Sequence, residues 1–295
     1  MLKFLLGPRV TVVGQTQFIN HPEYDIPEDG DDHTRLGAFA AKGCYDSYGL
    51  NGRSCEANQR AILEHRHGSV MEHSMVSLFI EGITRGVSLE INRHRSFAIS
   101  QRSTRYTQEE DSAVVLEPYM ASIVYRLLAE APHAFHESPT QMTRFELVRY
   151  NEPNLYFAPN DIAPLADWKP EYSLLHRVLF ASTTALSSYA DQVGILEQLN
   201  PNDFTGFDLR KWARGKARNT LPHGLETRGT WSNNHRGWRW FIESRNDIHA
   251  EPEIRLLAFE VWKVLVKLAP VYYGDFEITD YHDGIPVLRP MYSKV

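Results

Sequence analysis

The stretch EINRHRSFAISQRSTRY, residues 90–106, carries four arginines, one histidine and five hydroxyl side chains in seventeen positions. This density of cations is unexpected, because the chain of 295 residues has a formal net charge of −6. Binding to a nucleic-acid backbone usually needs a basic excess over a whole face or domain. A local group of arginines in an acidic chain usually indicates a solvated basic surface, and a pocket for small anions such as nucleotide phosphates is the alternative interpretation.

The composition, with 42% apolar residues, predicts a globular protein with a sizeable core. We expect one domain over residues 1–295, with an insertion over residues 117–169, where proline, asparagine and histidine become frequent. No apolar run approaches the roughly twenty residues of a membrane helix, and the N-terminal run reads as a strand rather than a signal peptide. Two cysteines are too few for a disulfide framework, so the cytoplasm is the expected location.

Strands and long helices follow one another without a regular alternation, which predicts the α+β class. An apolar, β-branched run predicts a buried strand that ends at Gly82, and the residues after Arg95 are expected to form a loop with free backbone N–H groups. An apolar stripe at helical spacing predicts a helix over residues 251–269, and residues 235–245 also read as a helix.

Several common site chemistries lack their motifs in this sequence. Neither the phosphate loop of nucleoside triphosphatases nor the dinucleotide-binding glycine fingerprint is present. His67 and His73 are six residues apart, which matches no zinc helix motif, so we predict no metal site. Cys44 is expected to be packed and Cys55 to lie in a polar loop, and both are interpreted as structural. Ser103 is interpreted as a hydroxyl that binds a ligand, since arginines cannot serve as its base.

The run RHRSFAISQRSTRY, residues 93–106, resembles the signature of the flavin-dependent thymidylate synthases, in which Arg-His-Arg, seven residues and Ser are followed by x-Arg-Tyr. Upstream, HGSVMEHSMVSLFIEGITRG (67–86) is similar to the family's His-x-Ser/Thr-x-x-Glu-His and the strand after it. Three downstream stretches follow the family's C-terminal half in order, namely ARNTLPHGLETR (217–228), NNHRGWRWFIESRNDIHAEPEIR (233–255) and APVYYGDFEI (269–278). Separated motifs in register make chance improbable.

The resemblance implies a fold and an activity. The expected fold is a central, mostly antiparallel sheet packed with long helices. The implied reaction transfers the one-carbon unit of methylenetetrahydrofolate to C5 of dUMP to give dTMP, with FAD as cofactor and NADPH as reductant, and without a cysteine adduct to the base. The resemblance also implies a homotetramer with active sites shared between subunits.

The resemblance further implies two sets of site residues. By motif position, the residues that contact FAD are Ser69, Glu72, Arg93, His94, Arg95, Gln101, Asn234, His235, Arg236, Trp240 and His249. Those that contact the nucleotide are Glu90, Arg93, Gln101, Arg102, Ser103, Thr104, Arg105, Arg218 and Arg245. Arg245 matches the catalytic arginine thought to help ionise the uracil at N3.

Physical reasoning supports some of these roles independently. The arginine fork matches phosphate oxygens, so Arg105 and Arg218, helped by Ser103, are expected to bind the nucleotide phosphate. A permanent cation at the edge of the base lowers the cost of charge on the pyrimidine ring, which suits Arg245. Arg245 lies four residues before His249, and a continuing helix would place both on one face.

Four positions depart from the family pattern. Arg102 stands where an apolar residue is usual, Ala98 replaces a common Ser, His223 stands where Asn is frequent, and Trp240 stands where Asn or His is usual. A guanidinium beside the base would alter which pyrimidine is accepted, whereas a side chain that points away would leave only the backbone N–H for the ligand. Two alternatives therefore stay open: methylation or hydroxymethylation of another pyrimidine nucleotide such as dCMP, and a non-catalytic nucleotide or nucleic-acid binder.

Overall fold

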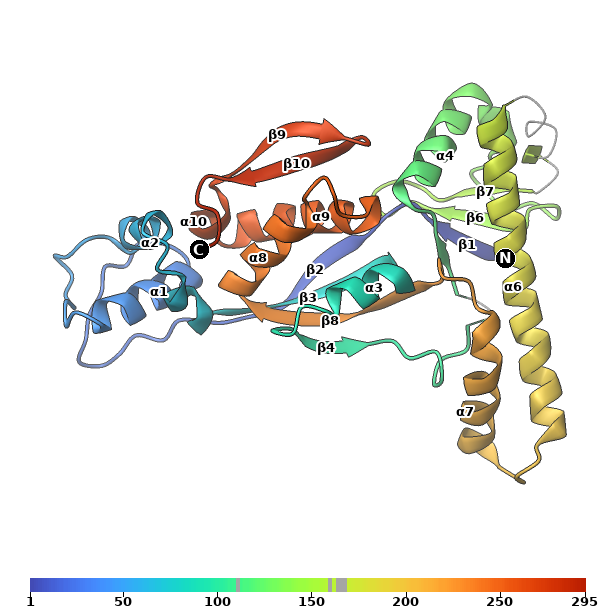
Figure 1. The fold of residues 1–295 in the computed structure, drawn as a ribbon, viewed down its shortest axis with the longest axis horizontal. Coiled ribbons are helices and arrows are strands. Elements are labelled where there is room, and N and C mark those ends of the chain that lie inside the picture. Colours follow the sequence, from blue (N-terminus) through green and yellow to red (C-terminus); the bar gives the residue numbers. More distant parts are fainter. Residues whose placement is uncertain (110–111, 159–160, 163–168) are drawn as a thin grey trace. The chain divides into compact units, whose positions relative to one another are not determined.

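The computed structural model describes residues 1–109, 112–158, 161–162 and 169–295, and Figure 1 labels their helices and strands. The chain forms two compact units. The first unit comprises Met1–Pro8, Glu81–Leu89 and Gln101–Arg228, and the second comprises Arg9–Ile80, Glu90–Ser100 and Gly229–Val295. Both units combine helices with strands, which confirms the predicted α+β class.

The first unit contains a four-stranded sheet with the strand order β5-β1-β6-β7. β1 runs parallel to both of its neighbours, and β7 runs antiparallel to β6. Phe4 and Leu147 of this sheet belong to one buried cluster with Leu127 of α4 and Leu175 of α6. The elements are β1 (Leu2–Leu5), β5 (Val114–Val115), α4 (Pro118–Glu130), β6 (Phe145–Val148), β7 (Leu155–Phe157) and α6 (Pro170–Leu199).

The segment 117–169, expected as an insertion, forms α4, the short turn η2 (Pro132–Ala134), β6 and β7. Glu117 starts α4, because its carboxylate accepts hydrogen bonds from the backbone N–H groups of Tyr119 and Met120, both at 3.0 Å. Residues 159–160 and 163–168 of the segment lie outside the described residues. The single domain and its insertion remain predictions.

The helix α7 (Gly206–Ala217) lies beside α6 in the first unit and leads directly into the short turn η3 (Arg218–Thr220), as Figure 1 shows. Arg218 therefore directly follows the last turn of a helix, at a position fixed by packing of that helix. Among the helices of the described residues, none combines the length and the apolar character needed to cross a membrane.

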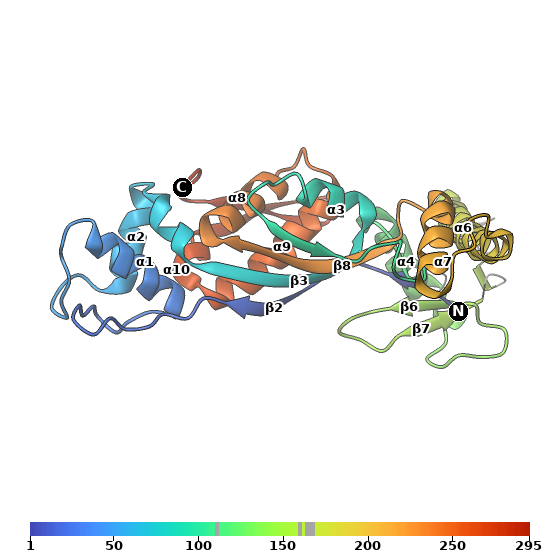
Figure 2. The ribbon, with the colours of Figure 1, turned by 90° about the horizontal axis from the view of Figure 1, so that it is seen from below.

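The second unit contains a sheet with the strand order β2-β3-β8-β4, and Figure 2 shows β2, β3 and β8 side by side. Trp238 anchors α8 to it, since this fully buried indole donates from Nε1 to the Val76 carbonyl of β3 at 3.1 Å. The buried residues of α9 follow the predicted stripe and include Leu257 and Val261. The elements are β2 (Arg9–Gln15), α1 (Asp32–Gly43), α2 (Cys55–Glu64), η1 (Gly68–His73), β3 (Met75–Thr84), α3 (Arg85–Ile91), β4 (Ala98–Gln101), β8 (Glu226–Asn234), α8 (His235–Arg245), α9 (Pro252–Leu268) and α10 (Pro270–Tyr273), of which β3, α3, β4 and β8 contribute residues to both units.

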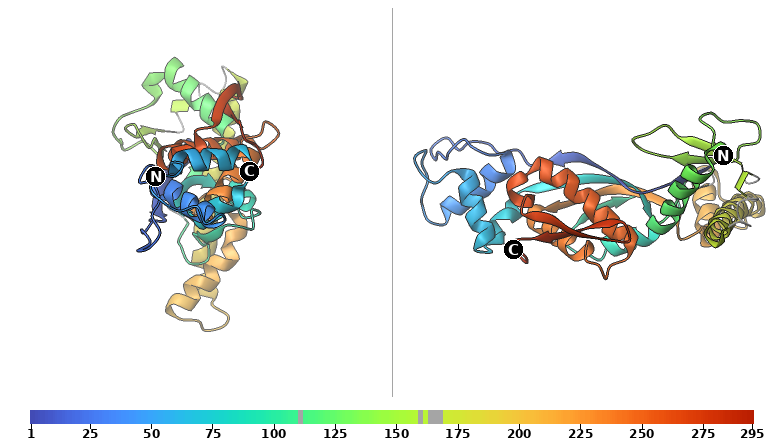
Figure 3. Two further views of the ribbon diagram at one scale, coloured as in Figure 1. Left: turned by 90° about the vertical axis from the view of Figure 1, so that its left-hand side faces the viewer. Right: turned by 90° about the horizontal axis from the view of Figure 1, so that it is seen from above.

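A C-terminal hairpin of β9 (Phe276–His282) and β10 (Ile285–Pro290) lies along α9, as Figure 3 shows. Asn246, the residue after α8, donates to the Pro286 carbonyl at 3.1 Å and accepts from the Leu288 N–H at 2.6 Å. These hydrogen bonds to the hairpin end helix α8 at Arg245. The expectation that one helix carries both Arg245 and His249 is therefore wrong.

Two further elements differ from their predictions. β3 does not end at Gly82 but continues to Thr84, and Gly82 adopts a positive φ of 70° within it, which a residue without a side chain allows. The expected loop after Arg95 contains the strand β4, whose first three residues are exposed and show no apolar alternation. Its pairing with β8 supplies hydrogen bonds that the sequence pattern does not reveal.

Candidate active site

Gln101 and Arg102, at the end of β4, are fixed by hydrogen bonds within the first unit. The Gln101 Nε2 donates to the Ser88 Oγ at 2.9 Å and to the Thr227 Oγ1 at 3.0 Å. The backbone N–H of Arg102 donates to the Arg228 carbonyl at 2.9 Å. The Arg102 N–H is therefore engaged with β8 and is not free for a ligand.

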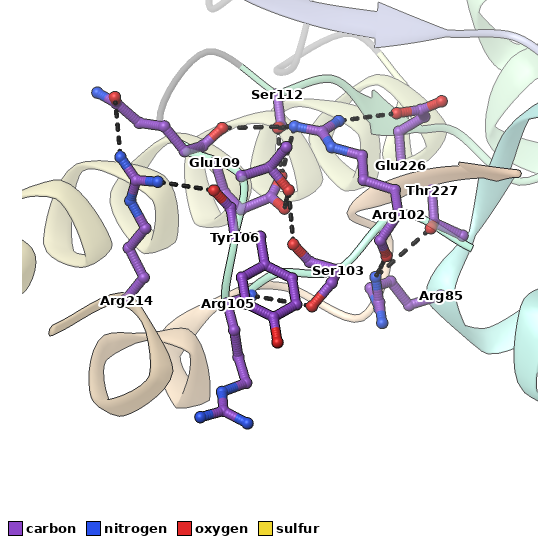
Figure 4. Close-up of polar contacts among 12 residues, drawn as sticks. Arg85, Arg102, Ser103, Arg105, Tyr106, Glu109, Ser112, Arg214, Glu226 and Thr227 are labelled. Atoms are coloured by element: carbon purple, nitrogen blue, oxygen red, sulfur yellow. Dashed lines mark hydrogen bonds and ion pairs between the residues drawn. The ribbon is translucent and has the colours of Figure 1, made fainter. Parts of the chain in front are cut away.

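The guanidinium of Arg102 lies between two buried carboxylates, as Figure 4 shows. Its Nη2 is 2.9 Å from an oxygen of Glu109, and its Nη1 is 3.3 Å from an oxygen of Glu226. The same Nη2 donates to the Ser112 Oγ at 2.7 Å. The side chain that the sequence marked as unusual is thus engaged by acidic groups of the chain itself.

The residues after Arg102 form a compact turn. The Ser103 carbonyl accepts hydrogen bonds from the N–H groups of Tyr106 at 3.2 Å and Thr107 at 3.1 Å. Thr104 is buried inside this turn, whereas the Arg105 side chain is exposed. The turn therefore leaves the Arg105 guanidinium open to solvent, where an anion can reach it.

Helix α7 supports the outer side of the same turn. Arg214 donates to the Tyr106 carbonyl at 2.8 Å, and the ring of Tyr106 stacks on that of Phe207 with centroids 6.0 Å apart. A Cβ added to Gly215 would lie 3.6 Å from the Arg105 Nε, so Arg105 crosses α7 at a residue without a side chain. Helix α7 thereby fixes the turn and supports the side chain of Arg105 where it crosses the helix.

Positive charge accumulates in this part of the first unit. Burial lowers the pKa of the Arg85 guanidinium; the Glu109 carboxylate opposes this, while the charges of Arg102 and Arg218 add to it. Arg218 is exposed at the end of α7. Because cations that repel one another are stabilised by an added anion, the arrangement suits a phosphate group.

In the second unit, Arg245 is held by two of the other predicted site residues. Its Nε donates to the His94 Nε2 at 2.8 Å, and its Nη1 is 3.2 Å from an oxygen of Glu90. Burial and the Arg245 charge lower the pKa of His94 to about 4. His94 is therefore neutral at physiological pH, with Nε2 as the acceptor and the ring proton on Nδ1.

Five of the other predicted FAD contacts in the second unit are exposed. They are Arg93, Arg95, Ser69, Trp240 and His249. Guanidinium groups suit the phosphates of a ligand, and an indole suits an aromatic ring.

The other four predicted FAD contacts in the second unit are bound to groups of the protein itself. Glu72 and Arg236 form an ion pair at 2.5 Å on the surface of the second unit. Asn234 caps α8 by accepting a hydrogen bond from the Gly237 N–H at 2.8 Å. His235 is fully buried, with its Nδ1 2.9 Å from the Tyr273 hydroxyl. The structure thus places His235 in the core of the second unit.

Arg85, Glu109 and Glu226 belong to the network around Arg102 and were not among the predicted site residues. Arg85 donates to the Arg102 carbonyl at 3.2 Å. A signal for Glu109 exists in the sequence, since the acidic run 109–111 closely follows the arginine-rich stretch. No local pattern marks Glu226, because it is 124 residues from Arg102 along the chain.

The two cysteines exchange their expected environments. Cys44 is exposed after α1, whereas Cys55 is buried and its thiol donates to the Pro27 carbonyl at 3.0 Å. Burial raises the pKa of Cys55 to about 11, so this thiol is protonated at neutral pH. A protonated and buried Cys55 thiol is a poor nucleophile.

The buried histidines predict a loss of stability in acid. Burial lowers the pKa of His235 well below its usual 6.5, and the pKa of His33, with its ring 4.5 Å away, is lowered as well. As the pH falls below 6.5, the unfolded chain binds protons that the folded chain excludes, so stability is full above that pH and declines below it. His235 contributes up to about 1.4 kcal/mol per pH unit.

Urea unfolding between pH 7.5 and 5 measures this effect. The His235→Gln variant, which cannot titrate at this position, is expected to lose less stability over that range than the unaltered chain. An equal loss in both proteins would contradict the assignment of the pH dependence to His235.

The chain is similar to one described protein family and to several of its named members. A family model described as thymidylate synthase complementing protein matches residues 28–271. The flavin-dependent thymidylate synthase of Mycobacterium tuberculosis H37Rv is 31% identical over 282 residues, which are 95% of this chain and 94% of that protein. That of Mycolicibacterium gilvum is 31% identical over 291 residues, 97% of each chain.

A solved structure shares the fold. It is the crystal structure of the UMP/dUMP methylase PolB from Streptomyces cacaoi bound with 5-Br dUMP, with a TM-score of 0.56 and 16% identity over 92% of this chain and 96% of that one. The expected α+β fold with its long helices is thereby confirmed.

Proposed function

We propose a function for this chain on one premise: it belongs to the thymidylate synthase complementing protein family. The proposed reaction is the reductive methylation of dUMP at C5 to dTMP, with FAD as cofactor and methylenetetrahydrofolate and NADPH as co-substrates. The observation that carries this proposal is the group of cations in the first unit, where the partly buried Arg85 lies within electrostatic reach of Arg102 and Arg218 and the turn after Arg102 exposes Arg105.

We assign the nucleotide phosphate to the first unit. Arg105 and Arg218 are exposed guanidinium groups that bind phosphate oxygens through two parallel N–H donors each, and Ser103 adds a hydroxyl. Gln101 and Thr104 shape the turn beside them. Since a nucleoside lacks the phosphate, these residues favour a nucleoside monophosphate over a nucleoside.

We assign the flavin to the second unit. Bound FAD supplies the two-electron chemistry that the side chains of this protein lack. Exposed Arg93 and Arg95 neutralise its phosphates, and exposed Trp240 offers a ring for stacking. Ser69, Glu72, Asn234, Arg236 and His249 are proposed as further polar contacts. The buried His235 supports the start of α8 from within the core.

Arg245 is the proposed catalytic residue. C5 of the pyrimidine becomes nucleophilic when negative charge accumulates on the ring at O2, N3 or O4, and a cation at that edge stabilises this charge. The guanidinium of Arg245 cannot lose its proton at physiological pH. Neutral His94 and the carboxylate of Glu90 orient it through bonds of 2.8 and 3.2 Å. Arg93 and Glu90 are proposed to contact the same nucleotide.

The proposed assembly is a homotetramer with active sites shared between subunits, as the sequence resemblance implies. A single sedimentation or light-scattering measurement of the purified protein tests this part separately from the activity.

Release of tritium from [5-³H]dUMP tests the proposed reaction. We expect release only when FAD, NADPH and methylenetetrahydrofolate are all present, and a product with the mass of dTMP. Loss of tritium without methylenetetrahydrofolate, or a nucleotide of unchanged mass, would reject the methylation of dUMP by this chain.

A second candidate keeps the flavin and changes the acceptor. PolB of Streptomyces cacaoi, which shares the fold, is described as a UMP/dUMP methylase. His223, which departs from the family pattern, is the second reason to consider another acceptor; its exposed imidazole lies against Gly86, where an added Cβ would be 2.5 Å from Nε2. Competition of dUMP with UMP and dCMP in one assay, with products identified by mass, separates the two candidates.

A further inference from the structure

Arg102 lies at the centre of a buried charge network, and this network is independent of any ligand. Its side chain is 14% exposed, and those of Glu109 and Glu226 are 1% and 5% exposed. Carboxylates this deeply buried are stable as anions only with a cation and hydrogen-bond donors beside them. Arg102 is the cation that contacts both of them.

The network joins two ends of one loop, the segment Arg102–Glu109, to strand β8. Glu109 closes the loop, where it accepts hydrogen bonds from Thr107 at 3.2 Å and from the Ser112 hydroxyl. Glu226 belongs to β8 and also accepts from the Gly82 N–H at 3.4 Å. Arg102 therefore closes the loop on itself through Glu109 and fastens it to the sheet through Glu226.

The loop between these two ends carries Ser103 and Arg105. Its backbone hydrogen bonds include those from the Tyr106 and Thr107 N–H groups to the Ser103 carbonyl, and a bond from Arg85 to the Arg102 carbonyl at 3.2 Å holds its start. A loop of this length without such ties samples many conformations, each of which would misplace an exposed guanidinium.

We propose that Arg102 is a positioning residue, which shapes the Arg102–Glu109 loop through Glu109 and Glu226 so that Ser103 and Arg105 are preorganised for a nucleotide phosphate. It acts without touching that phosphate. This inference rests on the proposed function for the identity of the ligand, but the order of the loop is a property of the protein alone.

Burial raises the pKa of Glu109, against the opposing effects of the Ser112 hydrogen bond and the Arg102 charge. Without Arg102, two buried carboxylates would face each other with no shared cation. Protonation of one of them or opening of the loop would relieve the repulsion. Either outcome loosens the hydrogen bonds that depend on the closed loop.

Amide hydrogen exchange in the ligand-free protein tests the proposal. In Arg102→Met, we expect the Tyr106 and Thr107 amides to exchange about tenfold faster, while the Ala121 amide of α4, bonded to the Glu117 carbonyl at 2.9 Å, is unchanged. Arg126→Met is the matched control, because it removes an exposed arginine whose ion pair with Glu171 is 3.7 Å long. Unchanged exchange at Tyr106 and Thr107 in Arg102→Met overturns the proposal.

A milder variant covers the case in which Arg102→Met does not fold. Glu109→Gln keeps the size of the side chain and the Arg102–Glu226 pair, and it is expected to speed the same two amides about threefold. No change in this variant would likewise overturn the proposal.

Nucleotide binding provides the second readout. Arg102→Met is expected to raise the KM for the nucleotide about tenfold with kcat within about twofold, and Arg102→Lys to lie between. A fall in kcat with an unchanged KM contradicts a positioning role. If the unaltered chain binds no pyrimidine nucleotide, the proposed function fails, whereas the exchange result still decides whether Arg102 orders the loop.

Discussion

Replacing Arg245 with glutamine is expected to lower kcat with dUMP about 100- to 1,000-fold, the range seen when a donor to the transition state is removed. Glutamine is neutral, so it cannot offset charge on the pyrimidine ring. The substitution also leaves Glu90 without its partner at 3.2 Å and His94 without its donor at 2.8 Å. The effect falls on kcat because the charge is largest in the transition state.

Steady-state kinetics at saturating dUMP, with FAD content measured for each protein, tests this expectation. Arg245→Lys keeps a charge without the planar fork and should lie between the unaltered chain and Arg245→Gln. Arg289→Gln serves as the control, because it removes an exposed arginine of the same unit whose partner, Asp247, is 3.3 Å away. A kcat for Arg245→Gln within about threefold of the unaltered chain would remove Arg245 from the catalytic role.

Replacing Arg105 with alanine is expected to weaken dUMP binding about 10- to 100-fold, since hydrogen bonds between charged groups contribute roughly 1.5–3 kcal/mol. Arg105 is exposed and crosses α7 at Gly215, so its removal leaves no buried group unpaired. The loss therefore reports the contact with the ligand rather than damage to the fold. The chemical step is expected to change little, because the phosphate lies away from C5 of the base.

Calorimetric titration with dUMP and with deoxyuridine separates the phosphate contact from other effects. The Arg105→Ala variant is expected to lose affinity for dUMP and to keep the same weak affinity for deoxyuridine, which has no phosphate. Arg126→Ala, at an exposed position of α4, is the control in the first unit. An equal loss for both ligands would show that Arg105 shapes the site and does not bind the phosphate.

The sequence predicts best those elements whose burial follows a simple period. Residues 251–269 carry an apolar stripe, and α9 is found over Pro252–Leu268; residues 235–245 coincide with α8. Strand β4 was not predicted, because it is short and its first three residues are exposed. Its pairing with β8 therefore gives no alternation of apolar and polar residues in its sequence.

The site shows the same division between local and distant information. The lack of a regular period after Arg95 predicted a loop, and the family resemblance marked Ser103 and Arg105 within it as site residues. Local spacing did not identify the partners of Arg102, because Glu226 is 124 residues away and an ion pair gives no periodic pattern. Nor did spacing show that α8 ends at Arg245, which depends on bonds between Asn246 and residues of β10 such as Leu288.

The visible absorption spectrum of the purified protein tests the central claim, dependence on a flavin, most directly. The account predicts a yellow protein, or one that retains FAD through gel filtration after incubation with it, whose flavin absorbance is bleached by NADPH without oxygen. A colourless protein that retains no FAD after incubation would contradict it.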